Sequence, residues 1–234
     1  MTERRKELTA QGIYDLVGSV PTMLEIGCND GTDTLKFLEA MPGARIYCFE
    51  PDPRAIIRFK KITDGEDRIE LAEVAVSDTD GTTTFYGSSG RPPEKLRGPG
   101  ALHYHHLDEW DLSGSLRKPT GHLTFSPWTT FPEDRRYQVG TIRLDTWKRK
   151  HLDVTHIDFI WCDVQGAESL VVQGGPETLK VTDYLYMEYS ERPLYEGQAP
   201  LEELQFMLPG FDLIAICGSG RVEHNALFKN QRLM

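Results

Sequence analysis

Short apolar runs, separated by polar and glycine-rich stretches, dominate the first third of this 234-residue chain. Three of the runs have the length and composition of buried strands, at residues 22–26, 44–49 and 69–76. Apolar residues recur at helical spacing after Gly31 and again after Asp52, where Asp52 can cap a helix and Pro53 can occupy its first turn. Strands that alternate with helices in this way predict βαβ units and a parallel sheet covered on both faces.

The alternation continues through a strand at 82–86, stops at Gly87 and returns near residue 139. The intervening segment, residues 87–138, is rich in glycine, proline, serine, histidine and aromatic residues. An irregular stretch of this length inside a compact domain is typical of a binding loop or a lid. Its aromatic content argues against disorder, so we expect it to cover a binding site.

The second half of the chain returns to regular patterning. Three strands, a helix and a hairpin are predicted at residues 139–144, 156–162, 182–187, 200–208, 211–217 and 223–228. Asp145 is expected to cap a short helix, and residues 1–18 suit an amphipathic helix ahead of the first strand. The prediction is an α/β fold, a single domain over 1–234, with a mostly parallel seven-stranded sheet and a C-terminal antiparallel hairpin.

Composition narrows the range of partners. The formal net charge of -10 argues against nucleic acid, which requires a positive surface. No apolar run approaches the roughly 20 residues that span a membrane, and the first residues lack the apolar core of a signal peptide, so we expect a cytoplasmic protein without a membrane partner. The four cysteines form no C-x-x-C pair and are expected to be free thiols. A homodimer is compatible with the sequence.

The stretch from Met23 to Gly31 predicts a strand, a glycine turn and a helix in direct succession. Such a turn exposes backbone N–H groups at a helix start, which suits a nucleotide-type cofactor. Glu50 ends the next strand about 20 residues later, where an acid can accept hydrogen bonds from a ribose. Turn chemistry alone can also account for two glycines.

The glycines and acidic residues of this turn indicate which cofactor it can bind. A dinucleotide fingerprint has three glycines, whereas only Gly27 and Gly31 are present, so a nicotinamide-dependent oxidoreductase is disfavoured. Glu25 and Asp30 would repel a pyrophosphate and tolerate a cation. S-adenosylmethionine carries a sulfonium and an ammonium group, so it fits this turn better.

Four blocks of sequence resemble one family. They are Leu24–Gly31, Val74–Gly81, Thr141–Trp147 and Ile157–Glu168, the last reading Asp-Val-Gln-Gly-Ala-Glu from Asp163. Together they look like the FkbM family of S-adenosylmethionine-dependent methyltransferases, whose members methylate hydroxyl groups, often on sugars, glycans or polyketide natural products. The resemblance spans roughly residues 22–190 and implies a Rossmann-like class I methyltransferase fold. Residues 87–138 match little, which leaves the identity of the methyl acceptor open.

The resemblance also assigns residues to parts of the cofactor. It implies that the methionine moiety is surrounded by Glu25, Gly27, Asn29 and Gly31. Glu50 would hold the ribose hydroxyls, with Glu73, Val74 and Ala75 beside the adenine. Asp163 would lie at the end of its strand, directly below the methyl group.

Methylating an alcohol requires removal of its proton, by a carboxylate or with the help of a metal ion. Asp163 and Glu188, which end successive strands, are the expected catalytic residues and also the tentative ligands of a magnesium ion. A third ligand could come from His122, Gln165 or Glu168, although Glu168 could equally be a helix-capping carboxylate. The histidines of His103–His106 could suggest a metal, but a cluster without a role is at least as compatible.

These observations favour an O-methyltransferase acting on a small molecule or saccharide. In the segment 87–138, Tyr104, Trp110 and Trp128 are the expected stacking surfaces for a sugar ring. A catalytically silent cofactor-binding module that regulates a partner is the alternative from another class. The acids at 163 and 188 argue against it.

Overall fold

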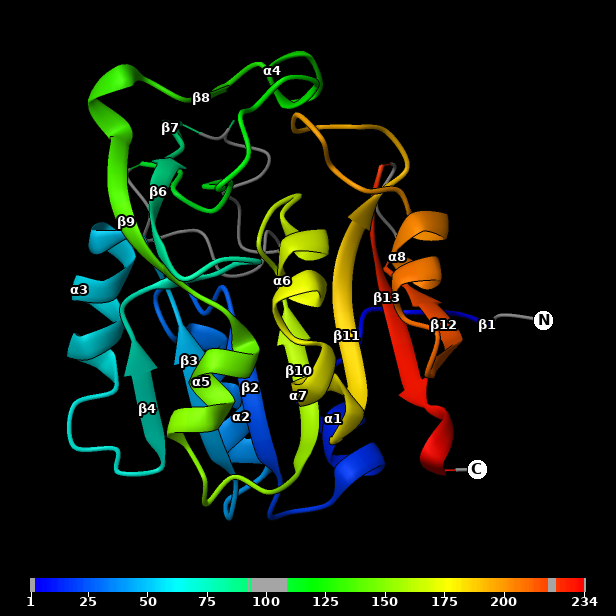
Figure 1. The fold of residues 1–234 in the computed structure, drawn as a ribbon. Coiled ribbons are helices and arrows are strands. Elements are labelled where there is room, and N and C mark those ends of the chain that lie inside the picture. The colour runs from blue at the N-terminus through cyan, green and yellow to red at the C-terminus, as the bar shows by residue number, and fades with distance from the viewer. Residues whose placement is uncertain (1–2, 92, 94–108, 219–221, 234) are drawn as a thin grey trace.

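The computed structural model describes residues 3–91, 93, 109–218 and 222–233, and Figure 1 shows their arrangement. A central eight-stranded sheet has the order β1-β12-β13-β11-β10-β2-β3-β4. Its strands are β1 (Glu3–Arg5), β2 (Thr22–Ile26), β3 (Arg45–Phe49), β4 (Ile69–Ala72), β10 (Ile157–Cys162), β11 (Thr182–Ser190), β12 (Phe211–Cys217) and β13 (Glu223–Asn230). All pairings are parallel except those of β13 with β11 and β12.

The α/β fold and the C-terminal hairpin are thus confirmed, with one addition. The predicted seven strands are joined by β1, which pairs in parallel with the outer strand β12. A single helix is predicted over residues 1–18, but among the described residues 3–18 only α1 (Ala10–Val17) is α-helical. The polar start of the segment instead follows the free edge of β12, where backbone pairing requires no apolar face.

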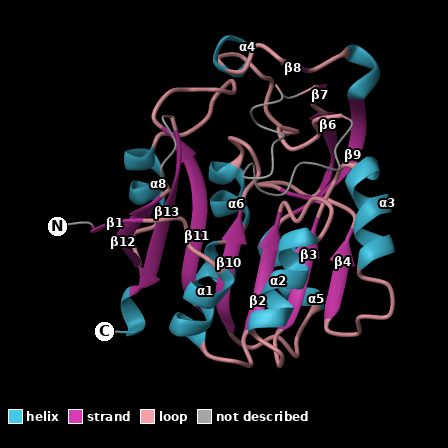
Figure 2. Ribbon diagram, turned by 180° about the vertical axis from the view of Figure 1, so that it is seen from behind, coloured by secondary structure: helices cyan, strands magenta, loops and turns pink. Residues whose placement is uncertain are grey.

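Helices cover both faces of the sheet, as a comparison of Figures 1 and 2 shows. One face carries α1, α2 (Thr32–Ala40) and α3 (Pro53–Ile62). The other carries α5 (Leu144–Lys150), α6 (Glu168–Gly174), α7 (Pro176–Lys180) and α8 (Leu201–Met207). Successive strand residues point to opposite faces, so Met23 belongs to the first apolar core and Leu24 to the second. The continuous apolar runs are explained by burial on both sides.

The run at residues 69–76, predicted as one strand, is in fact divided. β4 ends at Ala72, and β5 (Ala75–Val76) belongs to a second sheet with β9 (Arg136–Ile142) and β6 (Gly81–Tyr86). A tight turn separates the two strands, because the Val74 N–H donates to the Ala72 carbonyl at 2.9 Å. An apolar pattern does not reveal a turn of this kind, since both halves are partly or fully buried.

The described part of the segment 87–138 lies next to the second sheet and above the central sheet (Figure 1). This part contains β7 (Ser89–Gly90), α4 (His122–Phe125), β8 (Thr129–Thr130) and a 3-10 turn, Glu133–Arg135. The segment is therefore partly regular, and β9 begins inside it. Tyr104 and His103–His106 lie outside the described residues.

Two capping predictions had different outcomes. Asp52 caps α3, because its carboxylate accepts the Arg54 N–H at 2.9 Å. Asp145 does not cap the helix in which it lies; it accepts the Thr178 N–H at 2.8 Å and so caps α7. The four cysteines are free and buried, as predicted. In the described part of the chain, no helix is both long and apolar enough to cross a membrane.

Candidate active site

A cavity of about 440 Å³ opens at the carboxyl ends of the parallel strands, which is where open α/β sheets bind ligands. Its floor comes from the ends of β2, β3, β10 and β11 and from the start of β13. Its wall comes from the segment 87–138. The predicted site residues that line it are Glu25, Gly27, Asn29, Glu50, Val74, Ala75, Asp163 and Glu188.

The two glycines of the first turn are required by the fold of the turn itself. Gly27 has φ +89, and a Cβ there would lie 1.8 Å from the carbonyl oxygen of Asp163. Gly31 has φ +82, and a Cβ there would lie 2.8 Å from the Phe59 ring. These glycines let β2 and α2 approach β10 and α3 closely. Gly31 is not among the residues lining the cavity, so its role is to shape the turn.

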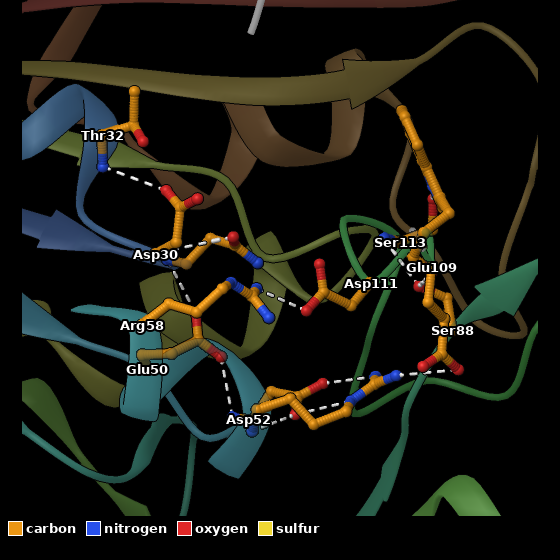
Figure 3. A network of polar contacts seen from close by, with 12 residues as sticks. Asp30, Thr32, Glu50, Asp52, Arg58, Ser88, Glu109, Asp111 and Ser113 are labelled. Carbon is orange, nitrogen blue, oxygen red and sulfur yellow. Dashed lines mark hydrogen bonds and ion pairs between the residues drawn. The ribbon is translucent and has the colours of Figure 1, made fainter. Parts of the chain in front are cut away.

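Glu50 binds the backbone of the turn Gly27–Gly31, the cofactor turn, as Figure 3 shows. One carboxylate oxygen accepts the Asn29 N–H at 2.9 Å and the other accepts the Asp52 N–H at 2.7 Å. Asn29 adopts φ +44, which aims its N–H toward Glu50. Burial raises the pKa of Glu50 to about 8, although the backbone donors of Asp52 and Asn29 oppose this shift. Glu50 therefore lines the cavity with both oxygens already oriented by the chain.

Glu25 is only 2% exposed and is the other buried acid of this turn. Its carboxyl accepts a hydrogen bond from the Thr34 hydroxyl at 2.5 Å and one from the Cys48 thiol at 3.7 Å. Burial, which outweighs these donors, raises the pKa of Glu25 to about 8. The charged form of Glu25 is therefore disfavoured near neutral pH, and a cationic ligand bound beside it would stabilise that form.

This raised pKa predicts a pH dependence of stability. A carboxyl whose pKa rises from 4.5 to about 8 on folding contributes stability below pH 4.5 that is lost as the pH rises toward 8. The midpoint temperature of thermal unfolding should therefore decrease as the pH is raised from 5 to 8. Glu25→Gln should remove this group's contribution to the pH dependence of the free energy of unfolding, which is up to about 1.4 kcal/mol per pH unit. The decrease in melting temperature should therefore be smaller for the variant. Melting curves of both proteins across this range test it.

The matched control is Glu39→Gln, which neutralises an exposed acid on α2. It should leave the slope of the pH profile unchanged. Parallel profiles for Glu25→Gln and the unmodified protein would contradict the burial of an uncharged Glu25.

The residues that the family resemblance places beside the adenine lie partly inside and partly outside the cavity lining. Val74 and Ala75 line the cavity, directly after the turn that ends β4. The neighbouring Glu73 is half exposed and its carboxylate pairs with the Lys60 ammonium at 2.6 Å, outside the cavity. The lining here is therefore apolar, as a flat base requires.

Asp163 and Glu188 come together at the floor of the cavity. The amide nitrogen of Gln165 donates to Asp163 Oδ1 and to Glu188 Oε2, both at 2.8 Å. Gln165 has φ +54 and is followed by Gly166 at φ +89, so two successive left-handed residues turn this amide toward both acids. Burial raises the pKa of Asp163, and burial together with the charge on Asp163 raises the pKa of Glu188 well above its usual range.

Gln165 is in turn held by Tyr195, whose hydroxyl lies 3.2 Å from Gln165 Oε1 and 2.9 Å from the Ser113 carbonyl. Gly166 packs against the same ring, because a Cβ there would lie 2.7 Å from it. The Asp-Val-Gln-Gly-Ala-Glu block therefore positions two acids by means of a glutamine and a glycine.

Glu168, for which the sequence left a metal-binding and a capping role open, lies outside the cavity lining. It is the first residue of α6, is 2% exposed, and its carboxylate accepts the Gly166 N–H at 3.1 Å. Burial raises the pKa of Glu168 to about 7. The structure gives it a part in shaping the turn after β10.

Glu223 lines the same cavity and was missed by the sequence reasoning. It pairs with Ser190 across the β11–β13 ladder, at the carboxyl end of β11. Burial and the charge on Asp163 raise the pKa of Glu223 to about 7. The available signal was the hairpin: the first residue of an antiparallel return strand lies at the edge where the parallel strands end.

Two tryptophans of the segment 87–138 form the upper wall. The rings of Trp110 and Trp128 meet edge to face, with centroids 4.8 Å apart, and both residues line the cavity. His122 also lines it and is 4% exposed. The segment is held to α3 by ion pairs from Arg58 to Asp111 at 2.5 Å and from Arg54 to Glu109 at 3.4 Å, part of which Figure 3 shows.

One group of potential metal ligands occurs in the described residues, and it lies elsewhere. His156, Asp158 and Asp183 gather at the opposite edge of the sheet, where β10 and β11 begin. The Arg232 guanidinium pairs with Asp183 there, so a cationic side chain already neutralises the group. The predicted ligands Asp163 and Glu188 do not form a three-ligand group with any described histidine, cysteine, aspartate or glutamate.

The strand order, with its antiparallel hairpin, defines the Rossmann-like class I fold of S-adenosylmethionine-dependent methyltransferases. The cavity at the ends of β2, β3 and β10 is the ligand site of that fold. The family model of the FkbM methyltransferase domain matches residues 25–218. The chain therefore belongs to the FkbM methyltransferase family and is a methyltransferase.

Known proteins similar to this chain include one close relative. The 2-O-methyltransferase NoeI of Sinorhizobium fredii (strain NBRC 101917 / NGR234) is 45% identical over 213 residues, which cover 91% of this chain and 81% of NoeI. Solved structures with a distant resemblance include the N-methyltransferase NodS from Bradyrhizobium japonicum WM9 in complex with S-adenosyl-l-homocysteine. Its TM-score is 0.45 and its identity 16%, and the match covers 94% of this chain and 85% of NodS. A SAM-dependent methyltransferase from Aquifex aeolicus has a TM-score of 0.44 and 11% identity, covering 94% of this chain and 89% of that protein.

Proposed function

We propose that this protein transfers a methyl group from S-adenosylmethionine to a hydroxyl group of a sugar, glycan or natural product. The observation that carries this proposal is the pair Asp163 and Glu188, held by one amide at the floor of a cavity whose wall is two tryptophans. The similarity to a 2-O-methyltransferase supports oxygen as the methylated atom. The acceptor is then a small molecule or a saccharide.

The residues present fit the cofactor. Glu25, Asp30 and Glu50 place acids in the turn, which suits a molecule with sulfonium and ammonium groups. Glu50 stands at the end of β3 with its oxygens oriented toward the turn, where ribose hydroxyls can donate to them. Val74 and Ala75 offer an apolar surface for the adenine.

The cofactor supplies an electrophilic methyl group on a sulfonium. The tryptophan wall holds the acceptor so that its hydroxyl oxygen lies in line with that methyl, at about 3 Å. The oxygen forms the new C–O bond as the C–S bond breaks, and the hydroxyl proton passes to Asp163 or Glu188. Their raised pKa values suit a base that must hold this proton near neutral pH.

A magnesium ion bound by Asp163 and Glu188 is the alternative to a carboxylate base. Such an ion requires oxygen ligands in octahedral positions at about 2.1 Å. In the structure an amide nitrogen, that of Gln165, lies between the two carboxylates, and its oxygen faces the Tyr195 hydroxyl. The side chains present therefore fit a carboxylate base better than a magnesium site, and we assign no step to a metal.

The cofactor assignment has a direct test. S-adenosylhomocysteine should raise the midpoint of thermal unfolding, because a ligand that binds only the folded state stabilises it by mass action. At 100 times its dissociation constant the gain is about 2.7 kcal/mol. NAD should give no shift, since the turn lacks a third glycine and carries acids. A shift with NAD alone would overturn the assignment.

The variant Glu50→Ala locates the ribose site. It should weaken S-adenosylhomocysteine binding by about 5- to 100-fold, because two hydrogen bonds from ribose hydroxyls contribute roughly 0.5–1.5 kcal/mol each. Calorimetric titration measures this change, and Glu73→Ala, one strand away and outside the cavity, is the control. Equal affinities would mean that the ribose is held elsewhere.

A further inference from the structure

The charge of the cavity lining restricts the acceptor. Eight of its residues are acids, namely Glu25, Asp30, Asp33, Glu50, Asp111, Asp163, Glu188 and Glu223. No lysine or arginine occurs among the described residues that line it. Burial raises the pKa of several of these acids, so the lining is only partly charged near neutral pH, but its carboxyls cannot pair with an anionic group. Glu188 and Glu223 lie on the β11–β13 side, away from the cofactor turn, so acids also face the acceptor.

Two arginines near the cavity form ion pairs with acids, and none of the three nearby arginines is among the lining residues. Arg58 donates to Asp111 at 2.5 Å, and Arg54 donates to Asp52 at 2.6 Å and faces Glu109 at 3.4 Å. Arg117 donates to the Ser169 hydroxyl at 3.0 Å. The one basic side chain in the described lining is that of His122, and burial lowers its pKa. It therefore adds no positive charge near neutral pH.

A second, independent observation concerns neutral polar groups. His122 and Thr129 line the cavity and are 4% and 1% exposed. Among the described residues, His122 Nδ1 and Thr129 Oγ1 have no hydrogen-bond partner. A buried polar atom without a hydrogen-bond partner is unfavourable. A ligand in the cavity that bonds to both atoms would account for a histidine and a threonine at these positions. The His122 ring is fixed edge-on against Phe131 and Tyr195, with centroids 5.6 and 5.5 Å away.

We propose that this site selects an acceptor without phosphate, carboxylate or sulfate groups, and that His122 and Thr129 recognise its hydroxyl groups. The proposal rests on the proposed O-methyltransferase function and specifies its substrate class. A neutral hydroxylated ring can stack on the wall formed by Trp110 and Trp128 and donate to or accept from both side chains. An anionic group would be buried beside the carboxyls of Glu188 and Glu223, of which Glu223, with a pKa of about 7, is partly charged near neutral pH. It would find no cation in the described lining, and a buried charge without a partner is unfavourable.

The test measures binding and methyl transfer on the same protein. Protein saturated with S-adenosylhomocysteine is titrated with methyl glucoside, its glucuronide and glucose 6-phosphate, and the change in total tryptophan fluorescence is followed. Initial rates with S-adenosylmethionine are measured on a wider set of matched neutral and anionic glycosides. We expect the neutral member of each pair to exceed its anionic counterpart by at least about 100-fold in kcat/KM. Anionic acceptors used equally well would overturn the proposal.

Two pairs of variants identify the residues. Thr129→Val should weaken acceptor binding by about 5- to 10-fold, the loss of one hydrogen bond, whereas Thr130→Val on the exposed neighbour should not. Glu223→Gln should reduce the discrimination against anionic glycosides, whereas Glu203→Gln, an exposed acid on α8, should not. His122→Phe keeps the aromatic packing, removes the nitrogens and should act like Thr129→Val.

The outcomes separate this proposal from the proposed function. If S-adenosylhomocysteine stabilises the protein but no neutral glycoside binds or is methylated, the acceptor class is wrong and the cofactor assignment stands. If Thr129→Val and Thr130→Val behave alike, the recognition role of Thr129 is wrong. Loss of the S-adenosylhomocysteine shift itself contradicts the proposed function.

Discussion

Asp163→Asn and Glu188→Gln should each lower kcat by about 10²- to 10⁴-fold, the contribution that a positioned general base makes. Both acids lie at the cavity floor and share the amide of Gln165. Neither substitution removes volume, and each relieves repulsion between two buried carboxylates, so the folded protein should not be destabilised. Single-turnover rates with saturating cofactor, together with thermal melts, measure the two effects separately.

Asp158→Asn is the matched control on the same strand. Asp158 lies near the opposite end of β10 and accepts the Thr22 N–H at 2.7 Å, which an asparagine oxygen can still accept. It should retain full activity. Rates within twofold of the unmodified protein for both Asp163→Asn and Glu188→Gln would remove the carboxylate base from the mechanism.

Chelation distinguishes the base from a metal ion. With a carboxylate base, EDTA leaves the rate unchanged, and the rate rises with pH as the raised pKa is passed. Loss of activity in EDTA and its recovery with magnesium would instead assign Asp163 and Glu188 to metal binding. The position of the Gln165 amide favours the first result.

The sequence predicted the acids that end parallel strands because apolar runs and their ends are local features. Asp163 follows β10 directly, and parallel strands end at one edge of the sheet. Glu188 was predicted to end its strand as well, but β11 continues to Ser190, so Glu188 lies two residues before the strand end. Glu223 lies at the cavity because β13 runs antiparallel to β11 and therefore begins where β11 ends. Finding it from the sequence requires knowing both the hairpin and the strand beside which it packs. His122 and Thr129 lie in a segment without periodicity, so their burial became visible only in three dimensions.

Contacts between distant residues account for the other differences. Asp145 caps α7 through Thr178, which is 33 residues further along the chain, and Arg58 pairs with Asp111 across 53 residues. No short-range pattern encodes such partners. The turn at Val74 depends on a single backbone hydrogen bond to Ala72, so the split of residues 69–76 between two sheets was also outside the reach of an apolar pattern.

Gly27→Ala should be the most destabilising single substitution in the cofactor turn, at about 4–5 kcal/mol, which is at the upper end of single-residue effects. Its φ of +89 disfavours any side chain, and its Cβ would lie 1.8 Å from a backbone carbonyl that cannot rotate away. That carbonyl belongs to Asp163, whose N–H donates to Ile26 at 2.9 Å, so β2 and β10 would have to separate.

Gly18→Ala isolates the cost of the backbone angle from that of the collision. Gly18 has φ +80, and a Cβ added there would have no atom within 4 Å, so its substitution should cost only about 1–3 kcal/mol. Urea unfolding of both variants gives the difference, which is the energy of the contact between the turn and β10. If both variants lose the same stability, small shifts of the backbone relieve the collision. Gly27 is then required only for its positive φ. If Gly27→Ala loses more, the cofactor turn and the strand that ends in Asp163 are joined by this contact, and a side chain at position 27 would disturb cofactor binding and the catalytic acid together.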